Sequence, residues 1–105
     1  MALNVFWTQF ARDKLQDIHD HYAYKAGPRV AKKLISGIVD RTILLSDHPK
    51  AGPVENLLSS RPEAFRSLLF KNYKLIYRIN TEKMRIDVVH VFDTRQDPKK
   101  LSEFR

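Results

Sequence analysis

The sequence predicts an α+β fold in which two helices pack on one face of a twisted antiparallel sheet. Apolar residues recur with a period near 3.6 before Pro49 and with a period of two after Pro62. Helical patterns that precede a run of strands are typical of α+β proteins. The 105 residues carry no internal repeat and no linker, so we expect a single domain over residues 1–105.

The first half of the chain predicts one strand followed by two helices. Residues 3–7 are apolar and aromatic, as in a short strand. The hydroxyl of Thr8 can cap the first helix, Gly27 suits its end, and Pro28 suits the first turn of the second helix, which ends before Pro49. A joint this short predicts an antiparallel helical hairpin. The apolar faces of the two helices are formed by Ala11, Leu15, Ile18 and Tyr22, and by Ala31, Leu34, Ile35, Ile38, Thr42 and Leu45.

The second half predicts three strands, over residues 64–70, 73–79 and 85–92, joined by short hairpin connections. The element order is therefore β-α-α-β-β-β. Residues 93–105 are expected to be a polar tail. Alternation assigns Tyr73, Leu75, Tyr77 and Ile79 to the face packed on the helices, and Lys74, Ile76 and Arg78 to the other face. We expect that second face to be left for function.

The amino-acid composition narrows the kinds of partner and site that the protein can have. Nineteen Lys and Arg against twelve Asp and Glu give a net charge of +7 and a pI near 9.9, which favours an anionic partner such as nucleic acid or an acidic protein. The absence of cysteine excludes disulfides and thiolate metal sites. The sequence has no apolar stretch long enough to cross a membrane, and its N-terminus lacks a signal-peptide pattern. We therefore expect a cytoplasmic protein without a membrane partner.

The order and spacing of several motifs resemble the RelE/ParE toxin superfamily, whose members are the toxins of bacterial type II toxin–antitoxin and plasmid stabilization systems. The matching pieces are Trp7-Thr8 with Ala11 and Leu15, Pro49 with Gly52, Phe65-Arg66-Ser67-Leu68, Asn72-Tyr73-Lys74-Leu75-Ile76-Tyr77-Arg78-Ile79, and the closing segment from Val88 to Pro98. Each piece is mainly a hydrophobic pattern, but together they cover nearly the whole chain. The resemblance implies the same α+β fold.

The resemblance also implies a partner and a choice of targets. The partner is a cognate acidic antitoxin, disordered before it binds, in a hetero-oligomeric complex. RelE-like toxins act with the ribosome as mRNA endonucleases, whereas ParE-like toxins inhibit DNA gyrase without chemistry of their own. A third reading is a degenerate toxin that retains only antitoxin binding. Of these we expect a ribosome-dependent, metal-independent mRNA endonuclease, with gyrase inhibition as the alternative.

RNA cleavage of the RelE kind requires a base, an acid and cations on the phosphate, with no cofactor or metal. By position in the family motifs, the catalytic candidates are Arg66, Lys74 and Arg95, and the candidates for nucleic-acid binding are Arg78, Lys99 and Lys100. A nuclease would require Arg66, Lys74, Arg78 and Arg95 to converge on one face. Their alternative role is a solvated strand face, with Tyr73 and Tyr77 in the core.

The sequence departs from the RelE-like pattern at two places. Asp93 stands where many relatives carry a histidine, and His90, three positions earlier, does not replace it. No tyrosine follows Tyr77, so the C-terminal catalytic tyrosine of RelE is missing. Both departures weigh against nuclease activity. His19 and His21 lie two positions apart on a helix, on different faces, which excludes them as a metal pair.

Overall fold

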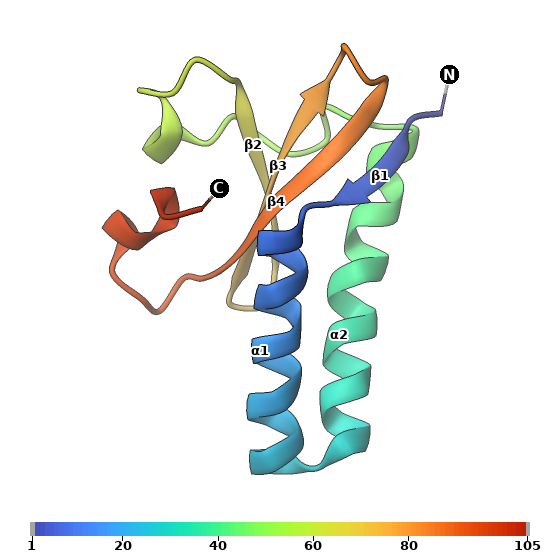
Figure 1. Ribbon diagram of the computed structural model, residues 1–105, viewed down its shortest axis with the longest axis vertical. Helices are drawn as coiled ribbons and strands as arrows, with labels where there is room; N and C mark the ends of the chain where they lie inside the picture. Colours follow the sequence, from blue (N-terminus) through green and yellow to red (C-terminus); the bar gives the residue numbers. More distant parts are fainter. Residues whose placement is uncertain (1, 105) are drawn as a thin grey trace.

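The protein is described by a computed structural model that covers residues 2–104. The elements are β1 (Asn4–Trp7), α1 (Gln9–Ala26), α2 (Pro28–Ile43), β2 (Phe65–Phe70), β3 (Tyr73–Asn80) and β4 (Arg85–Asp93), with short 3-10 turns at Leu44–Ser46, Asn56–Leu58 and Pro98–Ser102. The predicted order β-α-α-β-β-β is confirmed (Figure 1). None of the helices within residues 2–104 is long and apolar enough to cross a bilayer.

Local residue chemistry sets the helix ends. The Thr8 hydroxyl accepts a hydrogen bond from the Ala11 N–H at 3.3 Å and so caps α1. Gly27 ends α1 with a φ of 98°, a conformation that glycine adopts without strain, and Pro28 opens α2. The two helices form the predicted antiparallel hairpin, whose tip extends well beyond the sheet (Figure 1).

The sheet has the order β1-β4-β3-β2 and is mixed. β2, β3 and β4 are antiparallel neighbours as expected, but β1 pairs with β4 in parallel, from Asn4 opposite Arg85 to Trp7 opposite Val88. The expectation of an antiparallel sheet therefore holds for three strands and not for the first. The reason is that α1 and α2 run in opposite directions, so the helical hairpin returns the chain to the end of the sheet where β1 began. The chain then runs through β2 in the direction of β1, and two hairpins later β4 has that direction again.

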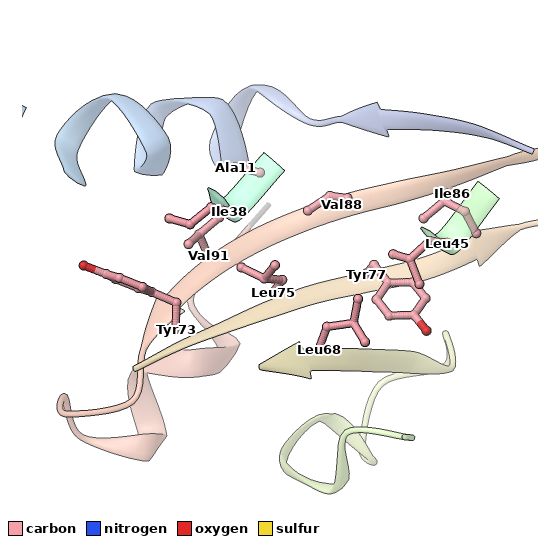
Figure 2. Packing of buried hydrophobic residues seen from close by; sticks show 10 residues of the cluster. All are labelled: Ala11, Ile38, Leu45, Leu68, Tyr73, Leu75, Tyr77, Ile86, Val88 and Val91. Carbon is pink, nitrogen blue, oxygen red and sulfur yellow. The ribbon is translucent and has the colours of Figure 1, made fainter. Parts of the chain in front are cut away.

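The main core lies between the helices and the sheet. Tyr73, Leu75, Tyr77 and Ile79 face the helices, as alternation predicts; Figure 2 shows ten buried side chains of this cluster. A bulge leaves Val89 without a partner on β3, because Tyr77 pairs with Val88 and Ile76 with His90. The bulge changes the phase of β4, so that Val88 and Val91 both face the helices.

A second core lies on the other face of the sheet and corrects two expectations. The segment after β4 is not a polar tail, since Leu101 and Phe104 are buried there. They pack with apolar residues from the sheet and from the 56–58 turn, namely Leu58, Phe65, Ile76, Val89 and Phe92. This face is consequently covered rather than open, because two large apolar side chains bury themselves on the exposed apolar residues of the strands.

Candidate functional site

Lys74 lies on the outer face of β3 and is held by a carboxylate. Its Nζ is 2.8 Å from Oε1 of Glu55, and the Glu55 side chain is only 5% exposed. Burial alone would raise the pKa of Glu55, but Lys74 and the Leu57 N–H outweigh it and hold this pKa below its usual value. The charge of Lys74 is thus directed at Glu55.

Arg66 lies on the opposite face of the sheet from Lys74. It pairs with Tyr77 across the β2–β3 ladder, and paired residues share a face, so Arg66 points to the helix side. Its Nη1 donates to the carbonyl oxygen of Gly52 at 2.8 Å. The Tyr77 hydroxyl accepts from the Gly52 N–H and donates to the Pro49 carbonyl. Arg66 therefore helps to hold the 49–52 loop.

Arg78 shares the outer face with Lys74, four residues further along β3, which corresponds to about 13 Å of strand. Its Nε lies 3.4 Å from Oδ2 of Asp87. The buried Asp87 carboxylate also accepts hydrogen bonds from Arg85 and Asn80 at 2.7 and 2.9 Å. Arg78 is thus one member of a network centred on Asp87.

Arg95 follows β4 and is joined to Asp93 by a bidentate pair, with Nη2 2.7 Å from Oδ2 and Nε 3.0 Å from Oδ1. Arg95 lowers the pKa of Asp93 to about 2. Contact with the Tyr73 hydroxyl and with Arg95 also lowers the pKa of Tyr22, which reaches this cluster from α1. Burial, followed by Tyr22, raises the pKa of Tyr73 to about 12. Figure 2 shows the Tyr73 hydroxyl pointing away from the other labelled side chains.

Lys99 and Lys100 lie in the Pro98–Ser102 turn and are exposed. Only Lys100 lines a cavity of about 610 Å³ between α1, the end of β4 and the C-terminal segment. The same cavity is lined by Arg95, and by Lys14 and Tyr22 from α1. The six predicted site residues are therefore distributed over both faces and one end of the sheet, and the four cations required for a nuclease do not converge.

His90 is a residue whose position the sequence did not reveal. It lines the cavity and is 3% exposed, and its ring lies 5.1 to 5.7 Å from the rings of Phe10, Phe92 and Phe104. Its Nδ1 has no hydrogen-bond partner among the described residues. Burial, with a smaller contribution from the Lys14 charge, lowers the pKa of His90 to about 4, so the ring is neutral at pH 7.

Two other residues of the candidate site were not identified from the sequence. Glu55 was missed because it lies in an irregular segment 19 residues before Lys74. Tyr22 was assigned only to the apolar face of α1, although its hydroxyl reaches the Asp93–Arg95 pair. The residues next to Glu55 gave no usable signal, since the neighbouring apolar residues Val54 and Leu57 are 53% and 51% exposed. Within residues 2–104, no group of three His, Asp or Glu side chains forms a candidate metal site.

Comparison with known proteins identifies the family. Residues 5–98 match the family model described as the ParE toxin of the type II toxin–antitoxin system parDE. A comparison with curated protein sequences finds no match.

Several chains of solved structures are similar to this one, and two of them illustrate the similarity. One is the chromosomal ParDE toxin–antitoxin system from P. aeruginosa, with a TM-score of 0.73, 23% identity, and coverage of 88% of this chain and 96% of that one. The other is the RelBE2 toxin–antitoxin complex from Mycobacterium tuberculosis, with a TM-score of 0.55, 24% identity, and coverage of 89% and 99%. Both share the fold of two helices on a four-stranded sheet. The family match over nearly the whole length shows that this chain belongs to the ParE toxin family of type II toxin–antitoxin systems, within the RelE/ParE superfamily.

Proposed function

We propose that this toxin acts by binding its target rather than by cleaving RNA, and that the target is DNA gyrase. The observation that carries the proposal is the dispersal of the candidate catalytic cations. Lys74 is paired with Glu55, Arg95 is paired with Asp93, and Arg66 is on the other side of the sheet. A phosphoryl transfer site needs its cations aimed together at one group.

The available acid–base groups support the same proposal. A general base works best with a pKa near the working pH, whereas the pKa of Glu55 is held below its usual value. His90 is neutral and enclosed by aromatic rings, and the pKa of Tyr73 is about 12. None of these three groups is suited to shuttle a proton at pH 7. Gyrase inhibition needs no such group, and it is the activity that the resemblance implies for ParE-like toxins.

An acidic antitoxin is the second part of the proposal. The two similar structures are toxin–antitoxin systems, and the net charge of +7 on this chain favours an acidic partner. We propose that this antitoxin binds the toxin in the cytoplasm and keeps it inactive. Co-expression of the toxin with the acidic product of the neighbouring gene should yield a stable complex in size-exclusion chromatography at moderate salt.

Induction of the toxin in cells tests the mode of action. Gyrase inhibition predicts an SOS response and DNA breaks that precede any fall in translation. The Arg95→Ala variant supplies a matched test, because Arg95 is 65% exposed and its loss leaves the core intact. We expect its toxicity to persist. Early translation arrest with cut mRNA, relieved by Arg95→Ala, would support the endonuclease instead.

A further inference from the structure

The tip of the helical hairpin has an unusual charge pattern. Residues 21–39 contain four Lys and Arg residues and no Asp or Glu. The four cations, Lys25, Arg29, Lys32 and Lys33, are all exposed. In residues 2–104 none of the four makes an ion pair, whereas Lys74, Arg78 and Arg95 all do. The tip therefore groups four cations that make no ion pair among the described residues, with no carboxylate between them in the sequence.

The geometry of α2 places three of these cations together. Arg29, Lys32 and Lys33 have the spacing i, i+3 and i+4, which puts them on one face of the helix. Like charges at this spacing destabilise a helix, and no carboxylate is interleaved to offset them. Lys25 adds a fourth cation from the last turn of α1. An anionic partner would relieve the repulsion among them.

An exposed aromatic side chain, Tyr24, directly precedes Lys25 in the last turn of α1. Tyr24 is 95% exposed, the largest exposed fraction among the large apolar side chains of the described residues, and Val30 on α2 is 48% exposed. The tip extends away from the sheet at one end of the molecule, so that a large partner can reach it (Figure 1). A solvent-exposed aromatic ring among cations is the combination that binds single-stranded nucleic acids, by base stacking and phosphate contacts.

We propose that the hairpin tip, defined as Tyr24, Lys25, Arg29, Lys32 and Lys33, is a sequence-independent contact surface for single-stranded nucleic acid. The cations bind backbone phosphates, and Tyr24 stacks on an unpaired base. The tip differs from the sequence-predicted candidates Arg78, Lys99 and Lys100, of which Arg78 is paired with Asp87. The inference does not depend on gyrase as the target, because it is tested with the toxin and an oligonucleotide alone.

The salt dependence of binding to a 20-nucleotide single-stranded DNA tests the phosphate contacts. The tip variant is Arg29→Ala/Lys32→Ala/Lys33→Ala. Its matched control, Arg12→Ala/Lys50→Ala/Lys83→Ala, removes the same charge from exposed residues elsewhere. Each phosphate contact with a single strand contributes about 0.7 to the slope of log K against log salt, so the tip variant should lose about 2 from the slope while the control retains it. Equal losses in the two variants would overturn the proposal.

Substitutions of Tyr24 provide a second, independent test of the proposal. Tyr24→Ala should weaken single-strand binding on the order of ten-fold, as expected for one stacked base, whereas Tyr24→Phe, which retains the ring, should bind as the wild type does. Circular dichroism checks that each variant is folded. Poly-glutamate serves as a competitor that has charge but no bases. If poly-glutamate binds the tip as tightly as the DNA does, and Tyr24→Ala changes neither, the surface belongs to an acidic protein and the proposal is wrong.

Discussion

Glu55 and Lys74 show at the scale of single residues how a cation predicted to be catalytic is paired with a buried carboxylate. The carboxylate is almost completely buried and accepts a hydrogen bond from the Leu57 N–H as well as the contact with Lys74. A buried carboxylate without a cation is costly. The pair therefore fixes the 3-10 turn at Asn56–Leu58 against the outer face of β3.

Removal of Lys74 should therefore destabilise the fold. We expect Lys74→Met to lower the free energy of unfolding by about 3 kcal/mol, because it leaves Glu55 buried and unpaired. The double variant Glu55→Gln/Lys74→Met, which removes both charges, should recover part of this loss. Urea denaturation of the four proteins of this cycle measures the coupling. A loss below about 0.5 kcal/mol would show that the pair behaves as an exposed one.

His90 predicts a pH dependence of stability. The pKa of His90 is about 4 in the folded protein against an ordinary value of 6.5, so between these pH values the unfolded chain binds a proton that the folded protein does not. The contribution of the neutral, buried His90 ring to the free energy of unfolding is fully retained above pH 6.5 and is lost as the pH falls towards 4. His90→Phe keeps an aromatic ring among Phe10, Phe92 and Phe104 but cannot titrate. Denaturation between pH 4 and 7 should show that the free energy of unfolding changes less steeply with pH in His90→Phe than in the wild type. Equal slopes in the two proteins would contradict the burial of a neutral His90.

At the scale of elements, the C-terminal segment determines what the sheet can present. Phe104 packs edge-to-face on Phe65 at 5.3 Å, and the Arg61 guanidinium lies 4.2 Å from the centre of the Phe104 ring. Arg61 also donates to the carbonyl of Ser102. The turn at Pro98–Ser102 is thus attached to both the sheet and the segment before β2, and it closes the outer face that the alternation pattern left for function.

Leu101 should be the main anchor of this segment. It is 1% exposed, so Leu101→Ala should lower the free energy of unfolding by about 2–4 kcal/mol through lost burial and a residual cavity. Lys99→Ala, two residues away and exposed, should change it by less than about 0.5 kcal/mol. Thermal unfolding of both variants makes the comparison. Equal, small effects would show that the segment contributes little to the core.

The helices, the strands and their inward faces could be predicted because hydrophobic periodicity reports burial directly. The thirteen-residue C-terminal stretch gave no such signal, since Leu101 lies in a turn too short to show a period and Phe104 follows that turn. The parallel pairing of β1 with β4 and the bulge at Val89 depend on neighbours distant in sequence. The same holds for the candidate site: the family motifs made Lys74 and Arg95 candidates, but only the fold supplies their partners Glu55 and Tyr22.

At the scale of the whole molecule, charge is distributed unevenly. Carboxylates pair with Lys74, Arg78, Arg85 and Arg95 in and beside the sheet, whereas the hairpin tip has no carboxylate between residues 21 and 39. Such a distribution orients the protein towards an anionic partner and accelerates their encounter at low salt. It also agrees with a toxin that acts through its surface, because binding requires an arranged surface and not a set of groups that transfer protons.

The central claim, inhibition of gyrase by binding, is tested most directly by a supercoiling reaction with purified components. Relaxed plasmid, ATP, gyrase and increasing toxin are incubated together, and the same toxin preparation is added to ribosomes programmed with a defined mRNA. We expect supercoiling to be inhibited in proportion to the toxin present, for the wild type and for Arg95→Ala alike, while the mRNA remains intact. Cleaved mRNA together with unaffected supercoiling would contradict the account.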